Sequence, residues 1–119
     1  MKVLLVCATM LLAGTASAQI ETNRATGAVL RALDKLSGDV VDITMKAGTL
    51  AQFGRLEIVL TECRFPKGNP SGDAFAGLQI RDTGRGTVIF AGWMVASSPG
   101  LSPMEHPRYD VWVMRCTLT

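Results

Sequence analysis

The residue types that could support chemistry gather in one stretch, residues 97–112. It holds a possible hydroxyl nucleophile, general base and orienting acid: Ser97 or Ser98, His106 and Asp110. The chain lacks the Gly-x-Ser-x-Gly motif that presents a nucleophilic serine on a strained turn. His106 also precedes a proline in an expected loop, where a histidine more commonly makes a hydrogen bond that fixes the backbone. The hydrolytic interpretation is therefore the less favoured one.

A metal site is the second chemical possibility. Its ligands would be Glu105, His106 and Asp110, which a turn could bring together. The segment offers no second histidine and no ligating thiolate, so the simpler interpretation is that Glu105 and His106 fix the loop through hydrogen bonds to the backbone. We predict no metal, no cofactor and no catalytic residue. A small metal-dependent or hydrolytic enzyme centred on His106 is the alternative, and a purely structural subunit whose exposed edge strand pairs with a partner is a third possibility.

Aromatic side chains lie in and near the same stretch. Trp93 and Trp112 can each bury ~150–250 Å², so core packing is their first interpretation. Strict alternation places Trp112 on one face with Asp110, however, and Trp93 opposite Phe90, so at least one tryptophan could line a surface groove suited to a peptide or glycan. The candidate partner-binding residues are Trp93, Ser97, Ser98, Glu105, His106, Tyr109, Asp110 and Trp112.

The elements that would position these residues are predicted to be strands, because turn residues recur every eight to twelve positions. The expected strands cover residues 28–33, 40–45, 49–53, 55–63, 75–81, 87–95 and 108–118. Residues 87–95 are apolar on both faces, which predicts either a central strand covered on both sides or a strand packed under a loop. Residues 64–73 and 97–107 are expected to be loops, and the polar residues 19–25 a frayed, flexible terminus. The fold prediction is all-β: a small single-domain β-sandwich or partly open barrel of about seven short strands over residues 26–119.

The first eighteen residues have the pattern of a secretory signal peptide. Lys2 precedes an apolar run over residues 3–12, and Ala16-Ser17-Ala18 supplies the small residues that signal peptidase needs. The apolar run is too short to span a membrane. We expect cleavage after Ala18, a mature chain that begins at Gln19, and a periplasmic location.

The charge of the mature chain excludes some classes of partner. Removing Lys2 leaves eleven Lys and Arg residues against ten Asp and Glu residues, a net charge of +1. The basic residues are scattered among the acidic ones, which is not the pattern of a nucleic-acid-binding protein. No second apolar segment approaches the ~20 residues of a transmembrane helix. We therefore expect neither a nucleic-acid partner nor an integral membrane segment.

Two of the three cysteines remain after cleavage, because Cys7 lies in the leader. Cys63 and Cys116 are an even pair in an exported domain, which predicts a disulfide. If Leu56, Ile58 and Leu60 point inward, strict alternation turns Cys63 outward. The disulfide must then lie at the rim of the sheet, or a β-bulge must intervene.

Several motifs together resemble a known bacterial family. They are Leu33-Asp34-Lys35, Phe53-Gly54-Arg55-Leu56, Gly92-Trp93-Met94, Ala96-Ser97-Ser98-Pro99 and Glu105-His106-Pro107-Arg108-Tyr109-Asp110-Val111-Trp112, with Cys63 and Cys116. In these residues the chain resembles the proteobacterial domain-of-unknown-function family numbered 2155. The resemblance covers nearly the whole mature chain and implies an exported protein with a paired-cysteine β domain, without an established activity. We expect a non-enzymatic periplasmic domain that binds or supports another cell-envelope component, a protein or a glycan.

Overall fold

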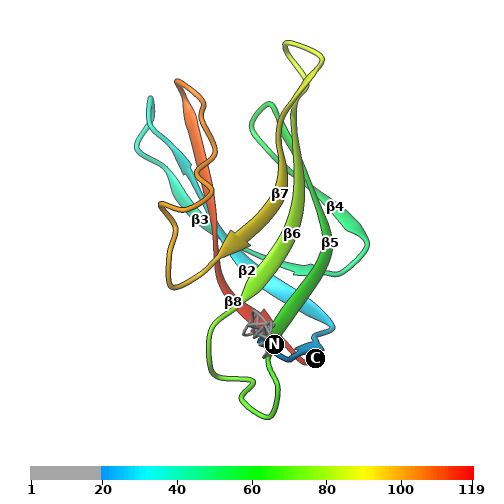
Figure 1. The fold of residues 1–119 in the computed structure, drawn as a ribbon. Helices are drawn as coiled ribbons and strands as arrows, with labels where there is room; N and C mark the ends of the chain where they lie inside the picture. Colours follow the sequence, from blue (N-terminus) through cyan, green and yellow to red (C-terminus); the bar gives the residue numbers. More distant parts are fainter. Residues whose placement is uncertain (1–19) are drawn as a thin grey trace, which may run out of the picture.

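The computed structural model describes residues 20–119, so the expected signal peptide and Gln19 lie outside the described residues. Eight strands form two antiparallel sheets that face each other (Figure 1), and no helix forms among residues 20–119. The strands are β1 (Thr22–Arg24), β2 (Gly27–Asp34), β3 (Val40–Lys46), β4 (Thr49–Phe53), β5 (Leu56–Pro66), β6 (Phe75–Asp82), β7 (Thr87–Val95) and β8 (Tyr109–Thr117). This part of the chain therefore has no helix that could cross a membrane.

The two sheets differ in size. The larger has the order β1-β5-β6-β7, with β4 also paired to β5, and the smaller has the order β3-β2-β8. The fold is sandwich-like and not a closed barrel, which confirms the all-β prediction. β7 and β8 are edge strands, one in each sheet.

The core lies between the sheets and follows the two-residue period of a strand. On β5, Leu56, Ile58 and Leu60 are fully buried, while Glu57 and Val59 between them are partly exposed. Leu30 of β2 is also fully buried. Each such side chain stabilises the fold by roughly 1.5–3 kcal/mol relative to an exposed position.

A β-bulge in β5 brings Cys63 into this core. Leu60 pairs with Leu78 and Glu62 pairs with Gly77, so Thr61 is the extra residue. The extra residue reverses the alternation, and Cys63 is fully buried where an unbroken strand would turn it outward. Of the two arrangements predicted for this cysteine, the bulge is the one that forms.

The prediction of a covered central strand over residues 87–95 is wrong. β7 pairs with β6 alone, and Val88 and Trp93 are 51% and 45% exposed. Trp93 pairs with Gly77 on the neighbouring strand β6. The Trp93 ring covers this glycine, since a Cβ at Gly77 would lie 3.5 Å from the ring. The apolar residues of β7 thus occupy the outer face of an edge strand as well as its inner face.

The N-terminal end of the domain is also more ordered than expected. Within the predicted frayed segment, β1 pairs with the last residues of β5. Arg64 Nε donates a hydrogen bond of 2.7 Å to Thr22 Oγ1. Arg64 and Phe65 therefore belong to a strand and not to the expected loop, and Phe65 is 6% exposed. Backbone pairing orders β1, which carries no apolar pattern.

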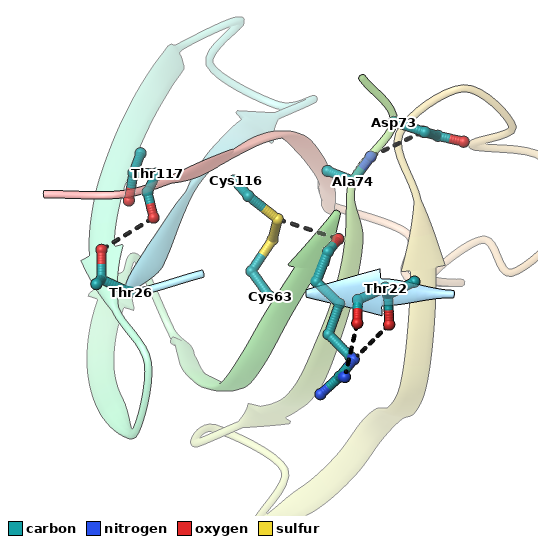
Figure 2. The surroundings of a disulfide bond; sticks show 8 residues. Thr22, Thr26, Cys63, Asp73, Ala74, Cys116 and Thr117 are labelled. Carbon is teal, nitrogen blue, oxygen red and sulfur yellow. Dashed lines mark hydrogen bonds between the residues drawn. A yellow bond between two sulfur atoms is a disulfide. The ribbon is translucent and has the colours of Figure 1, made fainter. Parts of the chain in front are cut away.

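The disulfide between Cys63 of β5 and Cys116 of β8 joins the two sheets, with the Cα atoms 5.7 Å apart (Figure 2). We expect Cys116→Ser to lower the free energy of unfolding by about 4 kcal/mol, because the cross-link closes a span of 53 residues in the unfolded chain. Urea unfolding of the oxidised protein measures the loss.

The double variant Cys63→Ala, Cys116→Ala separates the missing cross-link from the effect of a free buried thiol. Wild-type protein under reductant, which has two free thiols and no cross-link, should also lose stability relative to the oxidised protein. Rapid alkylation of both cysteines in the folded, unreduced protein would contradict the disulfide.

Candidate functional site

The candidate region is built on the loop between the two edge strands, residues 96–108, which we call the crossing loop. It leaves β7 in the larger sheet and enters β8 in the smaller one (Figure 1). Each end of the crossing loop is held by an aspartate that flanks β6: Asp73 just before that strand and Asp82 at its last position.

Ser97 holds the first end. Its hydroxyl donates a short hydrogen bond to Asp73 Oδ2, and its N–H donates to Asp73 Oδ1 at 2.9 Å. Burial opposes ionisation of this carboxyl, but the bonds from Ser97 and from the Ala74 N–H outweigh it and lower the pKa of Asp73. Ser98 uses its backbone, whose N–H donates to the Val95 carbonyl.

His106 holds the second end through both ring nitrogens. Nδ1 accepts hydrogen bonds from the N–H groups of Arg108 at 3.0 Å and Tyr109 at 3.1 Å. The ring hydrogen is therefore on Nε2, which donates to Asp82 Oδ2 at 2.8 Å. The His106 and Asp82 side chains are only 5% and 6% exposed. This bond is the main reason that the pKa of Asp82 lies below its usual value.

These contacts do not assemble the constellations considered from the sequence. His106 contacts Asp82 instead of Asp110, and Ser97 contacts Asp73 at the other end of β6. The strand from Phe75 to Asp82 alone spans about 23 Å at the usual rise per residue. Across residues 20–119, no group of three or more His, Cys, Asp or Glu side chains is arranged to hold a metal ion. Both ring nitrogens of His106 are engaged in hydrogen bonds within the fold.

Between the two anchored ends, the crossing loop and the two edge strands line a partly open cavity of about 300 Å³, which we call the apolar cavity. Its lining is mostly aliphatic and aromatic and includes two of the predicted site residues, Asp110 and Trp112. The lining residues are Met94, Val95, Pro99, Ser102, Pro103, Met104, Asp110, Val111, Trp112 and Val113. Trp112 is half-buried against the core, so it serves packing and also forms a cavity wall.

The remaining predicted site residues lie elsewhere. Trp93 is on the outer face of the larger sheet, and Glu105 is exposed on the crossing loop. Tyr109 is 2% exposed, and its hydroxyl accepts a hydrogen bond from the Arg55 N–H at 3.3 Å. A Cβ at Gly54 would lie 2.5 Å from that hydroxyl, at a backbone φ of 56° that favours glycine.

Sequence reasoning missed the acidic residues on which this region depends. Asp82 looked like an ordinary turn residue, and Asp73 like part of a surface loop. Asp34, within the motif Leu33-Asp34-Lys35, pairs with Arg108 through two guanidinium nitrogens, the closer at 2.9 Å. An aspartate at a strand end before a turn was the available signal, but it does not name its partner across the fold.

The fold and the site define a small β-sandwich with one disulfide and an anchored loop across its two edge strands. A family model described as an uncharacterized protein conserved in bacteria, DUF2155, matches residues 28–116, and the chain belongs to this family. It is similar to the uncharacterized protein RP359 of Rickettsia prowazekii (strain Madrid E), with 33% identity over 88 residues, 71% of this chain and 57% of that protein. The chain thus spans little more than half the length of this relative. No solved structure matches it.

We expect His106→Ala to lower the free energy of unfolding by about 1–3 kcal/mol, because it leaves buried hydrogen-bonding groups without their partner. Thermal or urea unfolding measures the change. The matched control is Glu105→Ala, since the neighbouring side chain is exposed and its removal should leave stability within about 0.5 kcal/mol. Equal stability of both variants would show that His106 does not anchor the loop.

Acid should weaken the domain through Asp34. The hydrogen bond from Arg108 is the main cause that lowers the pKa of Asp34 from 3.8 to about 2. A lowered pKa in the folded state gives stability that is present above pH 3.8 and is lost as the pH falls toward 2. Urea midpoints measured from pH 6 to pH 2 should therefore fall less steeply below pH 4 in Asp34→Asn than in the wild type.

Asp39→Asn changes an exposed acid in the same turn and is the control. An identical acid response in Asp34→Asn and the wild type would contradict the assignment.

Proposed function

We propose that this protein is an exported periplasmic domain without catalytic activity that binds another component of the cell envelope at the apolar cavity. A protein segment with an apolar side chain fits the cavity better than a glycan does, because its walls are formed mainly by methionine, valine and proline. The stretch predicted from the sequence as a binding region supplies most of these walls.

The observation that carries the proposal is the cavity itself. About 300 Å³ is the lower end of the range for ligand pockets, enough for one or two side chains. The anchors at Ser97 and His106 hold the crossing loop in place on the folded domain. A wall that is already in position loses less conformational entropy when a partner binds.

Export is supported by two separate features. The leader has the composition of a signal peptide. Disulfides persist in oxidising compartments such as the periplasm, and Cys63 and Cys116 form one.

Photo-crosslinking in cells tests the proposal. A photoreactive amino acid replaces Ser102, which lines the cavity, in the full chain expressed in a bacterium that carries the family. We expect one defined adduct in the periplasmic or membrane fraction, and N-terminal sequencing that begins at Gln19. The same amino acid at Lys46, exposed on β3, is the control and should give no adduct.

Trp112→Ala should remove the adduct at Ser102. Its melting temperature must be measured as well, because Trp112 also packs against the core. No adduct at Ser102 in a folded, exported protein, or the same adduct from Lys46, would contradict the proposal.

A further inference from the structure

A second cavity, of about 230 Å³, lies at the end of the sandwich where β4 turns into β5 and β6 turns into β7. We call it the basic cavity, because three of its eight lining residues are arginines and one is an acid. The lining residues are Arg55, Asp82, Gly84, Arg85, His106, Pro107, Arg108 and Tyr109. The lining has a surplus of two positive charges, which Asp34 reduces to one because it pairs with Arg108 from outside the lining.

Two of the three arginines have guanidinium N–H groups that are available to bind a ligand. Arg55 is exposed, and its guanidinium makes no hydrogen bond or ion pair with any of residues 20–119. Arg85 is 60% exposed, and its one ion pair within that range is a contact of 3.7 Å from Nε to Asp82 Oδ2. Arg108 is held by Asp34. Arg55 and Arg85 are therefore the groups available to a ligand.

The carboxylate in the lining competes little for these arginines. Asp82 Oδ1 accepts hydrogen bonds from the N–H groups of Gly84 at 2.9 Å and Arg85 at 3.2 Å, and Oδ2 accepts the one from His106. Its side chain is 6% exposed. The negative charge is thus buried and compensated from inside the protein, while the positive charges face solvent.

We propose that the basic cavity binds a phosphate group, held by the guanidinium groups of Arg55 and Arg85. A guanidinium presents planar paired donors that match the oxygens of an oxyanion, and Arg55 and Arg85 can each bind oxygens of one phosphate group through charge-assisted hydrogen bonds. Gly84 leaves room for this arrangement, since a Cβ there would lie 3.3 Å from Arg55 Cδ. The site is separate from the apolar cavity and does not depend on the proposed function.

Phosphate titration followed by amide NMR tests the site on the purified, disulfide-bonded protein. Inorganic phosphate is added at constant ionic strength, with sodium chloride as the balance. We expect saturable shifts of the Gly84, Arg85 and Arg108 amides. Arg55→Gln and Arg85→Gln should each weaken binding by about tenfold, the effect of one charge-assisted hydrogen bond. Arg115→Gln, which removes an exposed arginine of β8 outside this cavity, should leave the affinity unchanged.

Vesicles of phosphatidylglycerol and of phosphatidylcholine distinguish a lipid headgroup from a soluble phosphate compound. Binding to phosphatidylglycerol that is lost in Arg55→Gln assigns the phosphate to a lipid, and saturable binding of phosphate without it assigns a soluble ligand. Unsaturable shifts, or equal affinities in the wild type, Arg55→Gln and Arg85→Gln, would overturn the proposal. Melting temperatures confirm that the variants are folded.

Discussion

The buried hydrogen bond between His106 and Asp82 is the interaction on which the arrangement of the candidate region depends. A buried carboxylate without donors is costly, and Asp82 is satisfied only when the Gly84 and Arg85 N–H groups and the His106 ring are all in place. The same ring accepts hydrogen bonds from the N–H groups of Arg108, the last residue of the crossing loop, and Tyr109, the first residue of β8. The β6–β7 turn and the end of the crossing loop are therefore fixed together, although 24 residues separate the two side chains.

Because the crossing loop is anchored at both ends, its sequence divides into parts with different surroundings. The middle of the loop, with Pro99 and Met104, forms a wall of the apolar cavity. Its last residues, from His106 to Arg108, form a wall of the basic cavity. One connection between two edge strands thus contributes to two chemically distinct surfaces. β6 provides both anchoring positions, since Asp73 precedes it and Asp82 ends it.

The sequence was sufficient for the parts of the fold that depend on local pattern. Alternation and turn spacing predicted seven of the eight strands. The outward position that alternation gives Cys63 predicted either a disulfide at the rim or a bulge, and the structure has the bulge, at Thr61. β1 was missed because backbone pairing leaves no trace in side-chain pattern. β7 was misplaced because an apolar strand looks the same whether its outer face is covered or exposed. The roles of Asp82 and Asp34 were missed because their partners are 24 and 74 residues away in the sequence. Patterns of neighbouring residues do not identify such distant partners.

Two of the residues that suggested chemistry in the sequence, Ser97 and His106, hold the ends of the crossing loop in the structure. Serine, histidine and aspartate are the residue types of a catalytic triad. They are also side chains that readily form hydrogen bonds with backbone N–H groups and with one another at the end of a loop. Ser97 and His106 each bond a different aspartate, and both use the backbone as well. Groups engaged in this way position walls and present few free atoms to a ligand. The surfaces to which we assign recognition are built from other groups: the aliphatic lining of one cavity and the exposed guanidinium groups of Arg55 and Arg85 in the other.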